Sequence, residues 1–344
     1  MIDKMDQTIE IASHLDVGSL GILHLKRYWS KLNLKRIGAI PQEAYLDEWN
    51  TDTTLLAALG LGLEQTIKYL YKEQPGFDEF EKWILALNNG SISSDKIKGF
   101  NDTIRGVKPL PDSEELAYVL TEEDWNFWNE NGYFIIRNAV TKEDCNAAID
   151  AMCSFLEIDL EDTSTWYNPH SAKQGIMVQL FQHPALQKNR ESAKIKAVYE
   201  QLWGRKDLWL NTDRVSFNPP ETEAYQFQGP RLHWDVSLDL PIPFGLQGLL
   251  YLSDTAENQG AFTLVPGFHN RIEPWINSLP DDADPRREDL YALGPKPIAA
   301  GAGDFIVWYQ ALPHGSSPNT SNKPRLVQYI NYSPVDFESR GKWK

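Results

Sequence analysis

The chain has 344 residues, 42% of them hydrophobic and 12 of them tryptophan, so it can form one large domain or two smaller ones around a substantial core. Its formal net charge of −15 argues against nucleic acid or an anionic membrane as a partner, because both bind basic surfaces. Cys145 and Cys153 are too few for a disulfide framework and are expected to be reduced core thiols.

Two stretches bear on where the protein resides. Residues 1–6 lack the apolar run of a signal peptide. Residues 55–63 form the longest apolar stretch, which is far too short to span a bilayer. We therefore expect a soluble, cytoplasmic protein that makes no membrane contacts.

The first 113 residues predict helices followed by a connector. Apolar residues recur at helical spacing over residues 20–32 and from Thr54 to Tyr71, and residues 78–87 predict a third short helix that ends before Gly90. Residues 91–113, rich in polar residues and ending near a Pro-Leu-Pro, are typical of a connector. The apolar stripes need burial, so we expect this region to pack on the rest of the chain or to form a homodimer contact.

From residue 114 to residue 344 the pattern predicts a second, β-rich domain. A strand over residues 133–136 is followed by a helix over 141–156, and Asn218-Pro219-Pro220 must end a strand over 208–217. Four more stretches, rich in aromatic and aliphatic residues and bounded by Gly, Pro or Asn, predict antiparallel strands: residues 246–252, 261–265, 304–309 and 325–332. We expect an α+β fold, a double-stranded β-helix (jelly-roll, cupin-like) core with flanking helices.

Residues 269–300 form a long segment between two predicted strands. The segment contains several prolines and many charges, and its length makes it a candidate lid or substrate loop. Arg271 and Trp275 are its candidate substrate contacts, and Arg286 and Arg287 could also bind a polar substrate from above. A passive surface insertion is the alternative.

His233-Trp234-Asp235 and the later His314 are the candidate metal ligands. Side chains at positions i and i+2 of a strand share one face, so His233 and Asp235 can face a second strand that carries His314. Two imidazoles and one carboxylate bind non-haem Fe(II) and leave positions open for a co-substrate and O₂. By itself, a His-x-Asp can equally be a hydrogen-bonded surface pair. The histidines at positions 14, 24, 170 and 183 have no metal-like neighbours in the sequence.

Several stretches resemble the phytanoyl-CoA dioxygenase family of Fe(II)/2-oxoglutarate oxygenases. The resemblance lies in the residues from His314 to Ile330, and it extends over roughly residues 115–335. Three further stretches resemble sequence motifs of the family: residues 121–136, 246–254 and 260–269.

The resemblance implies a binding site for 2-oxoglutarate beside the metal. Ser316 and Arg325 lie two and eleven residues after His314, where the family holds the distal carboxylate of 2-oxoglutarate. An arginine on an inward-facing strand position needs an anionic partner, and its guanidinium can grip a carboxylate bidentately. The other carboxylate of 2-oxoglutarate usually has a polar partner on a neighbouring strand, and three residues remain open as candidates: Gln247, Asn211 and Asn218.

The implied activity is oxidation of a C–H bond with 2-oxoglutarate and O₂, giving succinate and CO₂. Hydroxylation is the default outcome, while desaturation or C–N cleavage would use the same residues. The negative charge of the chain disfavours a polyphosphate such as CoA, so we expect a small polar metabolite as substrate, with an acyl-CoA as the alternative. Asp235 occupies the position that a halide would need in a halogenase. A non-catalytic cupin-like binding protein and a zinc hydrolase are the rival interpretations.

Overall fold

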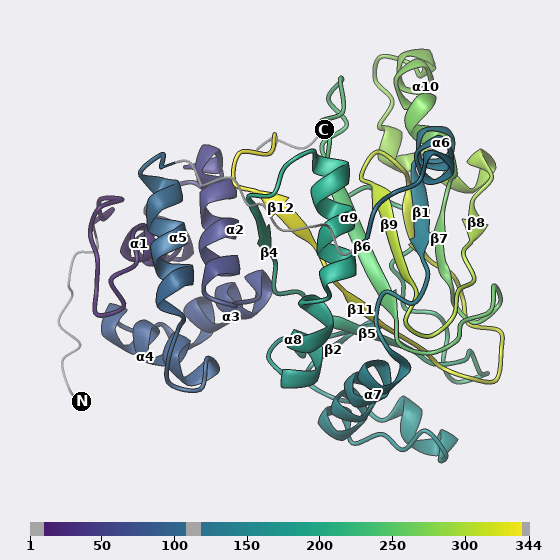
Figure 1. Ribbon diagram of the computed structural model, residues 1–344, viewed down its shortest axis with the longest axis horizontal. Helices are drawn as coiled ribbons and strands as arrows, with labels where there is room; N and C mark the ends of the chain where they lie inside the picture. Colours follow the sequence, from purple (N-terminus) through teal and green to yellow (C-terminus); the bar gives the residue numbers. More distant parts are fainter. Residues whose placement is uncertain (1–9, 108–117, 339–344) are drawn as a thin grey trace. The chain divides into compact units, whose positions relative to one another are not determined.

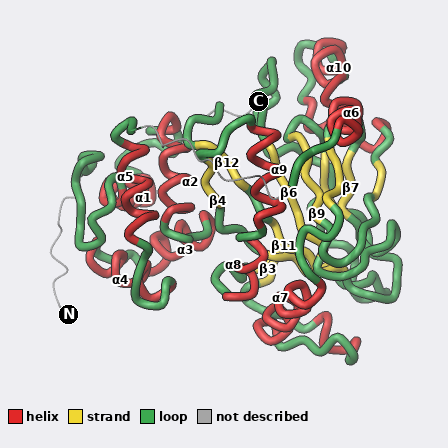
Figure 2. Tube along the Cα trace, viewed as in Figure 1, coloured by secondary structure: helices red, strands yellow, loops and turns green. Residues whose placement is uncertain are grey.

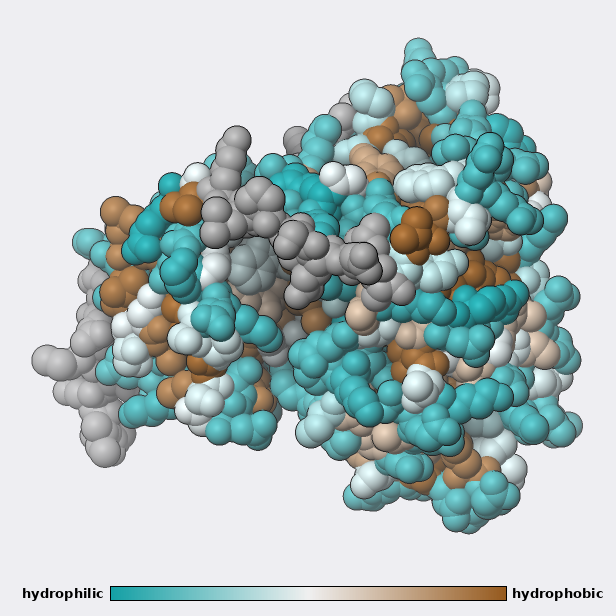
Figure 3. Space-filling model, viewed as in Figure 1, coloured by the Kyte–Doolittle hydropathy of each residue, from teal (hydrophilic) through white to brown (hydrophobic). Residues whose placement is uncertain are grey.

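The computed structural model describes residues 10–107 and 118–338. The chain divides into two compact units, Met1–Pro111 and Asp112–Lys344. Figure 1 shows the first unit as helices and the second as helices around β-sheets, and Figure 2 gives the same elements by type. In the part of the chain that the structure describes, no helix is both long and apolar enough to cross a membrane. Hydrophobic side chains on the face seen in Figure 3 form small groups among hydrophilic ones.

The first unit is a cluster of short helices. Helix α1 contacts α3, and α2 contacts α5. Leu25, Leu55, Leu70, Phe80 and Phe100 are fully buried between these helices. The helical elements are α1 (Leu25–Arg36), η1 (Leu46–Glu48), α2 (Trp49–Ala58), α3 (Leu63–Glu73), α4 (Phe77–Leu87) and α5 (Ser94–Ile104).

Two predictions for this unit need correction. The apolar stripe from Thr54 to Tyr71 is not one helix, because Gly60 adopts a left-handed backbone (φ +64°) between α2 and α3. Residues 91–113 are not simply a connector, because α5 runs through them and buries Phe100. Most residues of α5 are polar, so its sequence does not show the apolar stripe that would have predicted a buried helix. Residues 108–113 lie outside the described residues. The prediction that a helix ends before Gly90 is confirmed.

The second unit surrounds its sheets with helices. The longest of them, α7, matches the predicted helix over residues 141–156, and the side chain of Thr141 caps its first turn. The helical elements are α6 (Glu122–Asn131), α7 (Lys142–Leu156), η2 (Thr163–Tyr167), α8 (Pro184–Arg190), α9 (Ala193–Trp203), η3 (Phe268–Asn270), α10 (Ile272–Ser278), η4 (Pro285–Arg287) and η5 (Leu290–Leu293).

The described residues of this unit, 118–338, form three antiparallel sheets. The seven-stranded sheet has, in spatial order, β1 (Tyr133–Ile136), β9 (Phe305–Tyr309), β6 (Leu246–Tyr251), β11 (Arg325–Tyr329), β5 (Val215–Asn218), β3 (Met177–Val178) and β2 (Lys173–Gln174). The three-stranded sheet has the order β10 (His314–Ser316), β7 (Phe262–Leu264) and β8 (Lys296–Pro297). A small third sheet pairs β12 (Tyr332–Pro334) with β4 (Leu208–Leu210).

The strand order confirms the predicted jelly roll. The chain passes from β6 in the large sheet to β7 and β8 in the three-stranded sheet, returns to the large sheet at β9, and crosses again through β10 to β11, as a chain that winds between the two sheets of a jelly roll does. Because successive residues of a strand point to opposite faces, Leu249 and Tyr251 pack with Phe262 of the three-stranded sheet. Leu250 packs on the opposite face with residues such as Val198 of α9.

Three segments of this unit differ from their predictions. Residues 208–217 form two strands in different sheets, β4 and β5, instead of one. The strand predicted over 325–332 ends at Tyr329, and Tyr332 begins β12. The segment 269–300 is largely folded, with α10, η4, η5 and β8 within it. Burial raises the pKa of the Cys145 and Cys153 thiols to about 11, and both cysteines are free, as expected for core thiols.

Candidate metal centre

The structure brings His233, Asp235 and His314 together at the edge of the three-stranded sheet. Backbone hydrogen bonds of 2.9 and 3.0 Å pair His233 with His314, and the candidate ligand atoms of all three residues lie within 4.8 Å of one another. Asp235 Oδ1 lies 3.4 Å from His233 Nε2, and Asp235 Oδ2 lies 3.3 Å from His314 Nε2. Residues 234–236 are not in a regular strand, so the expected strand geometry holds only at His233.

The guanidinium of Arg286 holds the irregular segment that carries Asp235. Its two terminal nitrogens donate hydrogen bonds to the backbone carbonyls of Trp234 and Val236, which flank Asp235. Trp234 is buried and packs on Trp275 with ring centroids 6.0 Å apart, so its predicted packing position away from the ligands is what the structure shows. Arg286 therefore supplies the hydrogen bonds that a neighbouring strand would otherwise make.

Hydrogen bonds orient both imidazoles for ligation through Nε2. His233 Nδ1 lies 2.7 Å from the carbonyl oxygen of Arg231, and His314 Nδ1 lies 3.1 Å from that of Leu312. A carbonyl oxygen accepts only, so Nδ1 carries a proton in each ring. Nε2 faces Asp235: while it also carries a proton it donates to the carboxylate, and when that proton leaves, its lone pair can bind a metal. Two nitrogen lone pairs and a carboxylate thus converge on one point.

The charges of the three residues favour a cation at that point. Burial by itself would raise the pKa of the Asp235 carboxyl, but hydrogen bonds from His233 and His314 hold it well below its usual range. Burial likewise opposes a proton on His233, yet the Asp235 carboxylate raises the pKa of His233 overall. Asp235 is therefore ionised at neutral pH, and it can attract a divalent cation as it attracts these protons.

A cavity of about 110 Å³ opens beside the triad. Apart from the triad and Ser316, the lining residues with polar side-chain groups include Asp213, Arg214, Gln247, Tyr329 and Asn331. The sequence did not single out Asp213, Arg214 or Asn331, which lie between β4 and β5 or just after β11. They reach the cavity only through pairing of strands that are distant in the sequence.

Arg325 lies behind Ser316 and is 0% exposed. Its Nη1 donates to the Ser316 hydroxyl at 3.0 Å, and its Nη2 donates to the Ser216 hydroxyl at 3.1 Å. Its Nε has no hydrogen-bond partner, and within residues 10–107 and 118–338 no carboxylate forms an ion pair with it. A buried guanidinium held only by two hydroxyls is a site for an anion. Ser216 was not predicted, since a serine in a buried strand carries no distinguishing pattern.

The remaining predicted contacts lie at different distances from the cavity. Gln247 lines it, while Asn211 and Asn218 do not. The Asn218 side chain donates to the carbonyl of Ser317, and Asn211 bonds to Ser333. Arg271 and Trp275, outside the cavity lining, pack on the ring of Phe268 instead.

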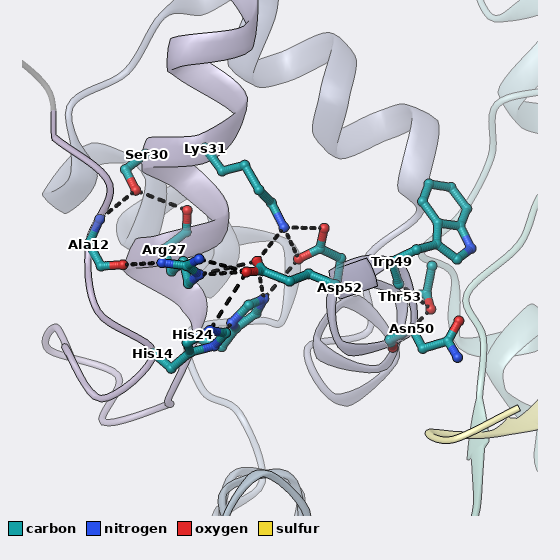
Figure 4. Close-up of polar contacts among 11 residues, drawn as sticks. Ala12, His14, His24, Arg27, Ser30, Lys31, Trp49, Asn50, Asp52 and Thr53 are labelled. Carbon is teal, nitrogen blue, oxygen red and sulfur yellow. Dashed lines mark hydrogen bonds and ion pairs between the residues drawn. The ribbon is translucent and has the colours of Figure 1, made fainter. Parts of the chain in front are cut away.

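A second group of histidines lies in the first unit, which corrects the prediction that these histidines have no metal-like neighbours. His14 and His24 are stacked, with their Nδ1 atoms 2.8 Å apart, and His14 Nε2 lies 3.6 Å from a carboxylate oxygen of Glu48 (Figure 4). The sequence could not show this because Glu48 is 24 residues beyond His24.

Cations of the protein already occupy this second group. Lys31 Nζ lies 2.6 Å from Asp52 (Figure 4). Glu48 lies 2.9 Å from Lys31 Nζ and 2.6 Å from Arg27. Although burial opposes the charge, hydrogen bonds from Arg27 and Lys31 lower the pKa of Glu48 to about 2. Two carboxylates facing two fixed cations are balanced, so a divalent metal here would meet repulsion from both cations.

Comparisons with known proteins show which family and which solved structures the chain is similar to. Residues 128–327 match the family described as Phytanoyl-CoA dioxygenase (PhyH). A Dictyostelium discoideum protein named "Putative phytanoyl-CoA dioxygenase" is 26% identical over 262 residues, covering 61% of this chain and 75% of that protein. EctD from S. alaskensis, solved with bound Fe, is 18% identical with a TM-score of 0.47 and covers 64% of this chain and 79% of its own. The non-heme alpha ketoglutarate dependent carbocyclase SnoK from nogalamycin biosynthesis is 19% identical with a TM-score of 0.46, covering 64% and 87%.

Proposed function

Because the chain belongs to the phytanoyl-CoA dioxygenase family, we propose that His233, Asp235 and His314 hold Fe(II) for the oxidation of a C–H bond in a small polar metabolite. The family depends on Fe(II) and 2-oxoglutarate, with O₂ as co-substrate. The donor set suits this metal, because two neutral imidazoles and one carboxylate are the facial set of non-haem Fe(II) oxygenases.

The observation that carries the proposal is the buried Arg325. A guanidinium without a carboxylate partner in a dry interior is costly, and an incoming carboxylate offsets that cost. Ser316 lines the cavity beside His314, and Arg325 lies behind Ser316 and donates to its hydroxyl, so this pair can bind the distal carboxylate of a keto acid whose other end reaches the metal. A zinc hydrolase would leave Arg325 without a role.

When bound, Fe(II) with 2-oxoglutarate and O₂ supplies the oxidising power and releases succinate and CO₂. The residues of the chain bind and orient the reactants. Phe262 and Trp308 line the cavity with apolar surface that excludes water, while Asp213, Arg214 and Asn331 offer charged and polar contacts to a substrate. This lining supports a small polar substrate over an acyl-CoA. We propose hydroxylation as the outcome; desaturation or C–N cleavage would place the same demands on these residues.

The test is succinate release by the Fe(II) protein, prepared without oxygen and started by adding O₂ with 2-oxoglutarate. A screen of amino acids, other small polar metabolites and acyl-CoAs should reveal one class that increases succinate formation and gains an oxygen atom by mass spectrometry. The Asp235→Ala variant serves as the metal-free control. If the protein binds Fe(II) and 2-oxoglutarate but forms no succinate with any class, the oxygenase proposal fails and a ligand-binding role takes its place.

A further inference from the structure

We infer that Gln247 and Trp308 are positioning residues that determine which oxygen of Asp235 faces the metal. The inference rests on the proposed function and adds a role to two residues beyond the ligands. The amide nitrogen of Gln247 donates to Asp235 Oδ2 at 2.8 Å, and the indole nitrogen of Trp308 donates to Gln247 Oε1 at 3.1 Å. The hydrogen bonds therefore run from Trp308 on β9 through Gln247 on β6 to Asp235.

The indole fixes the orientation of the Gln247 amide. An amide can flip and exchange its donor and acceptor ends, but an indole N–H only donates. Oε1 must therefore face Trp308, which leaves the NH₂ group facing Asp235. In the flipped orientation the amide oxygen would face the Asp235 carboxylate, and both hydrogen bonds would be replaced by repulsion.

The register of the strands β6 and β9 places Gln247 and Trp308 side by side. Gln247 on β6 and Trp308 on β9 are directly opposite each other in the antiparallel pairing. Trp308 is 2% exposed and packs between Phe262, at a centroid distance of 4.2 Å, and His314, at 5.1 Å. The indole is thereby held in one place, and it contacts one metal ligand directly and a second through Gln247.

Asp235 needs such a constraint more than the two histidines do. Its side chain is 47% exposed, it lies outside the regular strands, and apart from the two histidines Gln247 is its hydrogen-bond partner among the described residues. Asp235 Oδ2 lies 3.3 Å from His314 Nε2 but also accepts the hydrogen bond from Gln247, whereas Oδ1 lies 3.4 Å from His233 Nε2 and accepts no hydrogen bond from Gln247, so Oδ1 is the oxygen better placed to ligate a metal. A single carboxylate oxygen and two nitrogens leave three positions of an octahedron open, which a chelating keto acid and O₂ require. A carboxylate that turned to ligate through both oxygens would leave two.

The experiment is a double-mutant cycle on Mn²⁺ binding, measured by calorimetry because Mn²⁺ takes the same ligands without consuming O₂. Gln247→Leu should weaken Mn²⁺ binding about 10- to 100-fold, the usual effect of losing a partner of a metal ligand. Trp308→Phe keeps the aromatic packing but removes the N–H, so it should weaken binding several-fold. In the Gln247→Leu background, Trp308→Phe should have no further effect, because the N–H acts only through Gln247.

Three results would decide against the inference. Wild-type Mn²⁺ affinity in Gln247→Leu would overturn it. An equal effect of Trp308→Phe with and without Gln247 would show that the indole acts by packing on His314 alone. Absence of Mn²⁺ binding by the wild-type protein would overturn the proposed function as well, which separates the two failures. Gln226→Leu, at an exposed position of the same unit, is the matched control and should bind Mn²⁺ as the wild type does. A thermal unfolding midpoint for each variant checks that it is folded.

Discussion

Replacing Arg325 with methionine should separate the stability of the protein from its affinity for 2-oxoglutarate. The change removes two hydrogen bonds to serine hydroxyls, which contribute about 1 kcal/mol each. It also removes a fully buried charge with no carboxylate partner, whose burial costs several kcal/mol. The ligand-free variant should therefore unfold at the same temperature as the wild type or at a higher one.

The co-substrate should reveal the opposite effect. Losing a bidentate, charge-assisted partner costs about 3 kcal/mol or more, which weakens 2-oxoglutarate binding over 100-fold. With Mn²⁺ present and 2-oxoglutarate at about 100 times the wild-type Kd, the wild type gains about 2.7 kcal/mol, or roughly 5–10 °C for a unit of this size. The variant, with its Kd raised about 100-fold, gains only about 0.4 kcal/mol, close to 1 °C.

Thermal unfolding with and without 2-oxoglutarate measures both effects in one assay. Arg325→Lys is the matched control, because lysine keeps the charge but cannot bind a carboxylate through two parallel hydrogen bonds, and it should give an intermediate shift. If 2-oxoglutarate stabilises Arg325→Met as much as the wild type, another cation holds the co-substrate, and the reasoning from the buried guanidinium is wrong.

Four further outcomes are expected. Alanine at any one of the three metal ligands should remove most Fe(II) binding while leaving the fold intact, as measured by anaerobic titration and circular dichroism; unchanged binding in all three would contradict the site. A verified substrate should slow hydrogen exchange in residues 269–300, and Trp275→Ala should impair substrate turnover more than substrate-free decay of 2-oxoglutarate; equal exchange with and without substrate would show the segment to be passive. The apolar stripes in the sequence of residues 20–32 and 54–71 predict that deleting residues 1–110 causes aggregation, and a soluble, fully active truncation would show that region to be dispensable. Burial, His24 and Arg27 lower the pKa of His14, so the unfolded chain binds a proton at this histidine more readily than the folded protein does. The first unit should therefore keep its stability above the unfolded pKa of about 6.5 and lose stability as the pH falls below that value. A His14→Gln variant should lose this dependence in acid unfolding experiments.

The sequence predicted that His233, Asp235 and His314 come together, from the spacing of His233 and Asp235 and from the family motif that follows His314. An interval of two residues brings His233 and Asp235 to the same side of an extended chain, even though the structure forms a bridge at His233 alone. The family and the jelly roll could be predicted in the same way, from motifs and from apolar stretches bounded by turn residues, and both are confirmed.

Other features depend on pairing that no local pattern reports. The partition of residues 208–217 between two sheets follows from which strands lie beside them, and the same pairing brings Asp213 to the cavity. The helix α5 was missed because its mostly polar residues outweigh the one fully buried ring of Phe100. The meeting of His24 with Glu48 required a fold of the first unit that periodicity alone does not give.

The two hydrogen bonds from Arg286 make one part of the segment 269–300 less tolerant of substitution than the rest. The guanidinium donates hydrogen bonds to the carbonyls on both sides of Asp235, so this point of the segment cannot move outward without breaking the hydrogen bonds that hold a proposed metal ligand. Residues 279–284, by contrast, lie on the surface beside a separate open groove and make no contact of this kind with the backbone next to Asp235. Insertions and substitutions that alter what the segment recognises can therefore accumulate there at little cost to the metal. The same changes at Arg286 would remove hydrogen bonds to the backbone beside Asp235 and so disturb the proposed metal site.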